Sequence, residues 1–268
     1  MADMTFETLS LARDDRGVAT LTLEREEKHN ALSRQMIDEL TTATAHLAAD
    51  AGTRVVILTG RGASFCAGGD LGWMRSQMDS TRTERMAAAR ALAGMLGALN
   101  TLPKPLIGRI NGQAFGGGVG MMAVCDVAIG VTGSRFGLTE TRLGLIPATI
   151  SPYVLARMGE GRARRVFMSA RLFGAEEAVS LDLLARAVPD LAALDEAVEA
   201  EVTPYLKAAP GAVAASKRLA RSLGAEISPE VVERTIEALA DTWETDEARE
   251  GIAAFFDKRP PRWIAGGT

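Results

Sequence analysis

The residues that decide the fold form two glycine-rich stretches, Ser64-Phe65-Cys66-Ala67-Gly68-Gly69-Asp70-Leu71 and Asn111-Gly112-Gln113-Ala114-Phe115-Gly116-Gly117-Gly118. The apolar runs Val55 to Leu58 and Leu106 to Ile110 precede them, and both runs are typical of buried strands. Runs without side chains let backbone N–H groups approach a ligand closely, and the second stretch opens an apolar helix with a positive dipole end. Either stretch alone indicates only a tight turn. Together they favour a pair of N–H donors for a carbonyl oxygen that becomes an enolate oxyanion.

Strand and helix patterns alternate around these turns. Val18 to Leu23 predicts a strand, Ser33 is a predicted helix N-cap, and Thr81 with Glu84 forms a capping-box signature before a helix that reaches about Asn100. This alternation predicts an α/β core with largely parallel strands.

The second half of the chain changes character. Val127 to Val131 is strand-like, Arg135 to Leu145 predicts strand and loop, and everything after about Tyr153 is predicted as helical. Ser228-Pro229 is a helix start with a capping serine and a proline at the first helical position. The helical tail is expected to pack on the core or to oligomerise.

Composition excludes several classes of protein. The chain of 268 residues has a net charge of −4 from 30 basic and 34 acidic residues, which argues against nucleic-acid binding. Cys66 and Cys125 have neither metal-ligand nor disulfide spacing, so they suit a reducing compartment and are expected to be small buried apolar residues. No run is apolar enough for a membrane helix and Met1 to Asp15 shows no signal peptide, so we expect a cytoplasmic protein without a membrane partner or a metal site.

The histidine count restricts the chemistry. His29 and His46 are the only histidines, and no G-x-S-x-G elbow exists, so Ser-His-Asp hydrolysis has almost no support. Proton transfer must then fall mainly to carboxylates, and the segment Phe136 to Leu145 is predicted to present Glu140 from a loop.

A dinucleotide-binding alternative comes from the second stretch. Gly118-x-Gly120-x-x-Ala123 follows a strand, and Glu140 lies at the distance expected of a ribose-binding acid. The match begins far from the N-terminus and lacks the usual βαβ units after it, so a nicotinamide-dependent dehydrogenase is the weaker hypothesis.

The motifs together resemble the enoyl-CoA hydratase/isomerase (crotonase) family in order and spacing, over essentially the whole chain. The resemblance rests on Phe65 to Asp70, Asn111 to Gly118 and Phe136 to Pro147, with support from Lys28 to Ser33 and Phe256 to Arg259. It implies a spiral of ββα units with a CoA site over residues 1–200 and a helical trimerisation region over 201–268. It also implies an acyl-CoA thioester substrate, no cofactor other than the substrate's own CoA, and a homotrimer or dimer of trimers.

The resemblance also implies roles for individual residues. It makes Ala67 and Gly117 the oxyanion-hole donors, Glu140 the catalytic carboxylate, and Lys258 a basic position that can reach CoA, often from a neighbouring subunit. The remaining residues expected to contact the substrate are Lys28, Ala31, Leu32, Cys66, Gly68, Gly69, Asp70, Leu71, Trp73, Met74, Gly116, Gly118, Gly120, Arg142 and Phe256.

One departure from the family pattern concerns Gly120. Two-glutamate hydratases carry a glutamate at this position, so a mechanism with two carboxylates cannot be assumed. Gly120, with Asp70 to Met74 and Gly144 to Pro152, resembles bacterial hydratases of leucine and acyclic-terpene breakdown that act on 3-methylglutaconyl-CoA and longer homologues. A lone glutamate is also the pattern of Δ3,Δ2-enoyl-CoA isomerases, and loss of a carboxylate leaves open an inactive CoA-binding subunit.

Five side chains near these motifs have competing interpretations. We expect Glu140 to position water and shuttle its proton, and Arg142 is a candidate partner for a substrate carboxylate, with a surface salt bridge as the alternative. Asp70 is expected to cap the following helix. Trp73 and Met74 are expected to line the acyl pocket.

Overall fold

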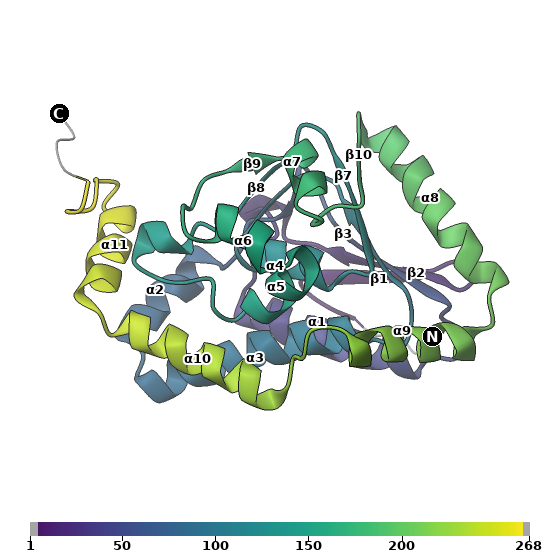
Figure 1. Cartoon of the computed structure of the whole chain (residues 1–268), viewed down its shortest axis with the longest axis horizontal. Coiled ribbons are helices and arrows are strands. Elements are labelled where there is room, and N and C mark those ends of the chain that lie inside the picture. The colour runs from purple at the N-terminus through teal and green to yellow at the C-terminus, as the bar shows by residue number, and fades with distance from the viewer. Residues whose placement is uncertain (1–4, 265–268) are drawn as a thin grey trace.

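A computed structural model describes residues 5–264 (Figure 1). The strands of this part of the chain are β1 (Leu9–Arg13), β2 (Val18–Leu23), β3 (Val55–Gly60), β4 (Ser64–Cys66), β5 (Leu106–Ile110), β6 (Gln113–Phe115), β7 (Val127–Val131), β8 (Arg135–Gly137), β9 (Phe173–Gly174) and β10 (Arg186–Val188). Its helices are η1 (Glu26–Lys28), α1 (Arg34–Ala49), α2 (Leu71–Asp79), α3 (Arg82–Thr101), α4 (Gly117–Val124), η2 (Glu140–Leu143), α5 (Ser151–Met158), α6 (Glu160–Phe167), α7 (Ala175–Ser180), α8 (Leu191–Lys207), α9 (Pro210–Leu223), α10 (Pro229–Trp243) and α11 (Asp246–Phe256).

The strands form two sheets. The larger has the order β1-β2-β3-β5-β7-β10, in which β1 is antiparallel to β2 and the following pairs are parallel. The smaller has the order β4-β6-β8-β9, with β4, β6 and β8 parallel. Each of β3, β5 and β7 leads into a strand of the smaller sheet and then into a helix. The chain therefore advances in ββα turns, as the resemblance implied, and lacks the single doubly wound sheet of the dehydrogenase alternative.

Two apolar cores position these layers. Strand residues such as Val55 and Ile107 are fully buried against Leu194 and Val198 of α8, which covers one face of the larger sheet (Figure 1). The larger core lies on the other face, where α1, α3 and α4 pack. Because both faces are covered, the parallel strands are continuous apolar runs.

The predicted strands and helix starts are mostly confirmed. The N–H of Met36 donates to Ser33 Oγ at 3.2 Å, and both bonds of the Thr81–Glu84 capping box are present. The prediction of helices alone after Tyr153 is wrong, because β9 and β10 lie there, and β4 and β6 lie within stretches predicted only as turns. These strands are two or three residues long, too short to show a two-residue alternation.

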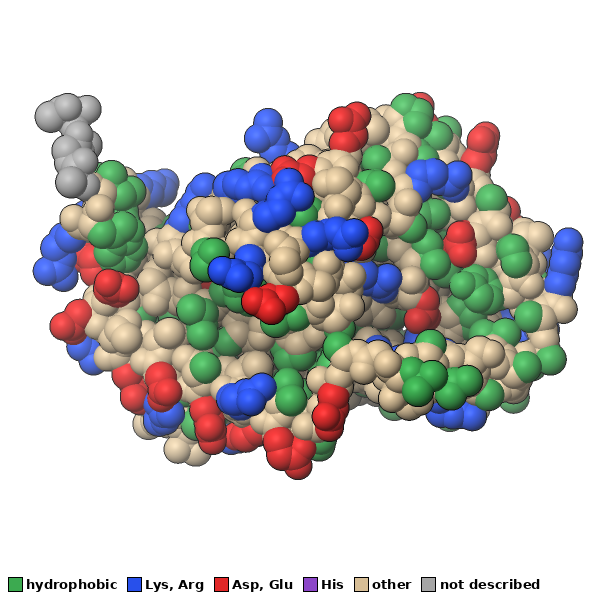
Figure 2. Space-filling model, in the orientation of Figure 1, with side chains coloured by type: hydrophobic (Ala, Val, Ile, Leu, Met, Phe, Trp, Pro, Cys, Tyr) green, Lys and Arg blue, Asp and Glu red, His purple; other side chains and the backbone are tan. Residues whose placement is uncertain are grey.

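The last three helices differ in how they meet the core. Helix α10 packs on α3, where Ile236 contacts Ala89 and Ala93. By contrast α9 has no buried residue, and Leu219 and Leu223 are 60% and 79% exposed. Figure 2 shows hydrophobic side chains gathered along the edge where Figure 1 places α9.

In residues 5–264 no helix combines the length and apolar character needed to cross a membrane. The predicted division of the chain at residue 200, between a core with the CoA site and a helical trimerisation region, stays a prediction.

Candidate active site

The two glycine-rich stretches meet through their backbones. Strand β4 pairs with β6, and beyond this pairing Gly68 adopts a φ of +88°. A Cβ at Gly68 would lie 2.9 Å from the carbonyl oxygen of Phe115, and one at Gly118 would lie 2.4 Å from that of Cys66. Both approaches are too close for a side chain. The glycines therefore allow the two turns to converge, as the sequence predicted.

Two backbone N–H groups are available where the turns converge. Gly117 is the first residue of α4, whose N-terminus has no side-chain cap, so its N–H has no partner within the helix. On the other turn Leu32 donates to the Gly68 carbonyl at 2.7 Å and Asp70 donates to the Leu32 carbonyl at 3.0 Å. This pairing leaves the N–H of Gly69 without an acceptor among residues 5–264. Gly69 and Gly117 line the same cavity.

The structure corrects the first predicted donor. The N–H of Ala67 donates to the carbonyl oxygen of His29 at 2.9 Å, and Ala67 does not line the cavity. The Ala67 N–H is therefore already hydrogen-bonded, and this bond connects its loop to the loop that contains His29. Gly69, two residues later, lines the cavity, and its N–H has no acceptor among residues 5–264.

Glu140 begins η2 at the edge of the cavity. A Cβ at Gly116 would lie 2.9 Å from Glu140 Oε1, so the carboxylate rests against the residue that precedes the Gly117 donor. Its Oε2 is buried without a hydrogen-bond partner in the described residues, although the side chain as a whole keeps some exposure. Burial raises the pKa of Glu140 to about 7, opposed only by a hydrogen bond from its own backbone N–H. A carboxyl group with this pKa can both accept and return a proton near neutral pH.

Gly120 lies on α4 against α5. A Cβ there would lie 2.6 Å from Ile150 Cγ2 and 3.0 Å from Ile150 Cβ. Ile150 therefore occupies the space that a second carboxylate would need. The packing of α4 against Ile150 thus requires a glycine at position 120, where two-glutamate hydratases carry a glutamate.

We expect Gly120→Ala to destabilise the protein by about 1–3 kcal/mol, because the added methyl overpacks the contact with Ile150. Gly94 is a matched control. It lies in the exposed interior of α3 with nothing within 4 Å of its Cβ position, so Gly94→Ala should stabilise by about 0.5–1 kcal/mol. Urea unfolding monitored by circular dichroism measures both. Equal stabilisation by the two substitutions would contradict the packing argument.

The segment from Lys28 to Leu32 lies beside the first turn. His29 and Asn30 adopt left-handed backbone conformations, with φ of 50° and 54°. The fully buried Asn30 amide donates to the carbonyls of Arg61 and Ser64, both at 2.9 Å, which fixes this loop. The structure therefore brings together the two segments that the resemblance assigned to CoA, with Lys28 exposed at their edge.

Asp70 has the structural role that the sequence predicted. Its Oδ1 accepts from the N–H groups of Gly72 at 2.8 Å and Trp73 at 3.1 Å, which caps α2. Its Oδ2 accepts from Arg25 at 2.9 Å, and Arg25 also donates to the Ala31 carbonyl. Asp70 therefore ties the start of α2 to the segment that follows η1.

The cavity is about 160 Å³ in volume and mostly apolar. Of the predicted site residues, those that line it are Leu32, Gly69, Trp73, Met74, Gly117 and Glu140. Residues that the sequence interpretation missed come from α2, α3 and α10, and they include Gln77, Arg85, Ala88, Ala89, Leu92, Leu239 and Trp243. The sequence spacing of positions 85, 88, 89 and 92 predicts that they share one face of a helix. The same spacing is found on a helix face that lines a pocket and on one that packs in the core, so it does not predict the pocket.

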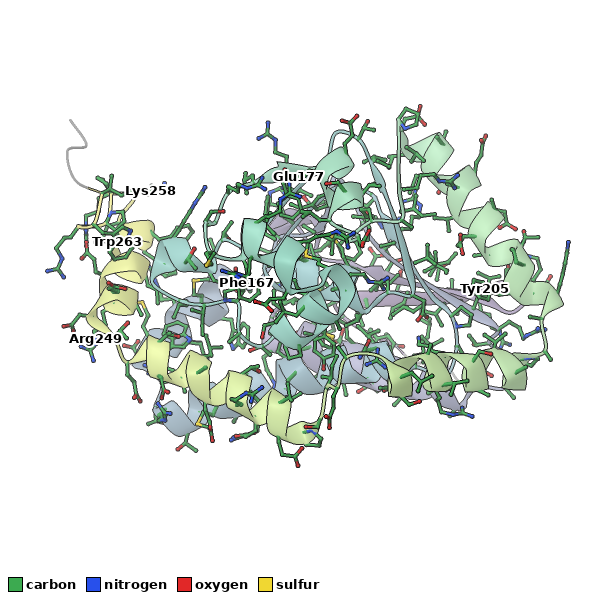
Figure 3. All side chains as sticks on the ribbon, in the orientation of Figure 1. Phe167, Glu177, Tyr205, Arg249, Lys258 and Trp263 are labelled. Atoms are coloured by element: carbon green, nitrogen blue, oxygen red, sulfur yellow. The ribbon has the colours of Figure 1, made fainter. Side chains whose placement is uncertain are left out.

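Other predicted residues lie outside the cavity. Arg142 is exposed and forms no ion pair among residues 5–264, so the structure does not support it as the partner of a substrate carboxylate. Phe256 packs under Arg75 of α2, with 4.6 Å from the guanidinium carbon to the ring centroid. Lys258 is exposed beyond the end of α11 (Figure 3), and Leu71 is 51% exposed.

The two cysteines are buried and free, as predicted. Burial raises the pKa of both the Cys66 and the Cys125 thiol to about 12, so both remain protonated at neutral pH. Cys66 contributes its carbonyl oxygen to the contact with Gly118 and carries no reactive thiolate.

Residues 13–266 match the family model described as enoyl-CoA hydratase/isomerase. The chain belongs to this family. A Thermus thermophilus protein provisionally named an enoyl-CoA hydratase is 36% identical over 92% of this chain and 97% of its own length. Among solved structures, an enoyl-CoA hydratase from Shewanella pealeana has 36% identity and a TM-score of 0.79, with 96% of each chain covered. One from Mycobacterium avium has 31% identity and a TM-score of 0.82, with 97% and 100% covered.

Family membership confirms the resemblance to the enoyl-CoA hydratase/isomerase family and the prediction of an enzyme. AtuE from Pseudomonas aeruginosa is a further solved structure similar to this chain, with 34% identity, a TM-score of 0.78, and 96% of this chain and 99% of AtuE covered. The spiral of ββα turns is accordingly the family's fold.

Proposed function

We propose that this enzyme hydrates the α,β double bond of an acyl-CoA thioester. The observation that carries the proposal is the placement of the Glu140 carboxylate against Gly116, beside a cavity that Gly69 and Gly117 also line. Among residues 5–264 the N–H groups of these two glycines have no acceptor. The thioester oxygen would accept from these two N–H groups. Each such donor is typically worth about 2.7–4 kcal/mol in the transition state.

The reaction needs one group that first accepts and then returns a proton. As the water oxygen bonds to the β-carbon, the Glu140 carboxylate takes the water proton and the thioester becomes an enolate held by the two N–H groups. The protonated Glu140 then delivers this proton to the α-carbon, which restores the carboxylate. A pKa of about 7 makes both steps feasible for one group.

An isomerase is the second candidate, and the absence of a carboxylate at Gly120 favours it. Moving a double bond from the 3- to the 2-position requires one group to take a proton from C2 and return it to C4. Glu140 alone can do this, whereas Ile150 fills the space of a second acid.

A coupled assay distinguishes these functions. The substrates are 3-methylglutaconyl-CoA, crotonyl-CoA and a 3-enoyl-CoA. Water addition that depends on Glu140 supports hydration, and preference for the first substrate supports the branched acidic class and a place in branched-chain or fatty acid breakdown. Double-bond migration without water addition would establish the isomerase. CoA binding without turnover of any substrate would indicate an inactive CoA-binding subunit.

The pH dependence follows from Glu140. Only the carboxylate can take a proton from water, and burial raises its pKa to about 7. We therefore expect kcat/KM for hydration to fall about tenfold per pH unit below pH 7 and to level off above it. A pH profile from 5 to 9 measures this. A plateau that extends down to pH 5 would contradict the role of Glu140 as the base.

The proposed assembly is a homotrimer or a dimer of trimers. The exposed apolar side chains of α9 support an interface in the C-terminal region, because α9 buries no residue within its own chain. We propose that CoA lies along residues 28–32 and 67–71, with Lys258 available to it in the assembly. Sedimentation equilibrium of the full chain tests the assembly, and a monomer at micromolar concentration would contradict it.

A further inference from the structure

One wall of the cavity carries a cation. Arg85 and Glu140 are the charged residues among the described side chains that line the cavity. Ala88, Ala89 and Leu92 line it from the following turns of α3, so with Arg85 they form one stripe of the helix. The cavity therefore runs along α3 from Arg85, over a rise of roughly 10 Å between positions 85 and 92.

The reacting groups lie toward the other end of this stripe. Leu96, one turn beyond Leu92, comes within 3.6 Å of the Cβ position of Gly120 on α4. Helix α4 begins at Gly117, and the preceding Gly116 contacts Glu140. Because Arg85 lies in the first turn of α3, it is at the end of the cavity away from the carboxylate.

The Arg85 guanidinium is held in place but not neutralised. Its Nε donates to the Gln77 carbonyl at 2.8 Å and its Nη2 to the Met78 carbonyl at 3.1 Å, while its Cζ lies 5.3 Å from the Trp243 ring centroid. Within residues 5–264 it forms no ion pair, and its Nη1 has no hydrogen-bond partner. A half-buried positive charge without a counter-ion favours an anion, and a carboxylate is the partner that best matches a guanidinium.

We propose that Arg85 binds a carboxylate at the far end of the acyl chain, which makes the substrate a short dicarboxylic acid joined to CoA through one end. The proposal rests on the proposed function, because that function places the thioester at Gly69 and Gly117. A cavity of about 160 Å³ is similar to cavities of about 150 Å³ that hold benzene, so the acyl chain should have about five or six carbons. Arg85 takes the role that the sequence interpretation gave to Arg142.

The test compares the affinities of two saturated thioesters, glutaryl-CoA and pentanoyl-CoA, by calorimetry. They have the same chain length and differ in the terminal carboxylate. We expect the wild type to bind glutaryl-CoA about 10- to 100-fold more tightly, the range typical of a hydrogen bond to a charged group. Arg85→Gln should abolish this preference and leave the affinity for pentanoyl-CoA unchanged.

Arg82→Gln is the matched control. Arg82 lies on the same helix and pairs with Asp241 at 2.7 Å and Glu244 at 2.9 Å, so this variant also loosens the region between α3 and α10 but outside the cavity. It should keep the full preference for glutaryl-CoA. The proposal would be overturned if both variants lost the preference for glutaryl-CoA equally, or if Arg85→Gln weakened the binding of both thioesters equally. Either result would mean that Arg85 only stabilises α2.

Two further outcomes remain decisive. If Arg85→Gln does not fold, Arg85→Lys keeps the charge and loses the bidentate geometry, so a smaller preference with unchanged pentanoyl-CoA affinity supports the proposal and an unchanged preference overturns it. A wild type that binds both thioesters equally also overturns it. Neither thioester contains a double bond, so failure of the hydration assay does not affect this measurement.

Discussion

Glu140→Gln is expected to lower kcat for hydration by about 10²- to 10⁴-fold, because glutamine keeps the shape of the side chain but cannot accept a proton. KM should change little, since the N–H groups of Gly69 and Gly117 that would hold the thioester remain in place. Steady-state kinetics on the substrate identified in the coupled assay measure both constants. Near-normal turnover would overturn the mechanism.

The same variant has an expected effect on stability. The carboxyl group ionises less readily in the folded chain, because burial raises its pKa from 4.5 to about 7. Its contribution to stability is therefore fully present below pH 4.5 and is lost as pH rises to 7. At pH 8 Glu140→Gln should thus be more stable than the wild type by about 3 kcal/mol, and the difference should shrink toward pH 5. Urea unfolding at both pH values measures it, and a less stable variant at pH 8 would contradict the burial of an uncompensated charge.

Gly116→Ala is expected to lower kcat/KM by about 10²-fold, although it replaces no catalytic side chain. Gly116 has a φ of +46°, and a Cβ there would lie 2.9 Å from Glu140 Oε1. The methyl group would displace the carboxylate, and a shift of about 1 Å can cost about 10²-fold. The positive φ of Gly116 favours glycine, so an alanine there adds about 1–3 kcal/mol of backbone strain.

Two controls separate displacement of Glu140 from a general loss of structure. Gly133 has nothing within 4 Å of its Cβ position, so Gly133→Ala should keep normal kinetics. In a Glu140→Gln background, Gly116→Ala should cause little further loss, because both substitutions remove the same function. Independent, multiplying losses would show that Gly116 does not act through Glu140.

The sequence by itself determined the local features of this protein. Helix starts at Ser33, Thr81 and Ser228 followed from capping residues, because a cap depends on a few neighbouring residues. The strands β3, β5 and β7 followed from their apolar runs, which are needed where both faces of a sheet are covered. The order and spacing of the motifs also led to the family and to Glu140, because each motif is a short contiguous run of residues that can be recognised without the fold.

Tertiary structure alone decided which groups reach the cavity. The choice between Ala67 and Gly69 depends on a hydrogen bond from the Ala67 N–H to the carbonyl oxygen of the distant His29. Tertiary packing likewise leaves Arg142 exposed and outside the cavity lining. Arg85 entered the site because α2 and α10 close over the start of α3, and its contact with Trp243 of α10 joins residues more than a hundred positions apart. Local spacing determines which face a residue occupies on its own element. Which faces then meet is determined by long-range packing, and that sets the free N–H groups, the raised pKa of Glu140 and the unpaired charge at Arg85.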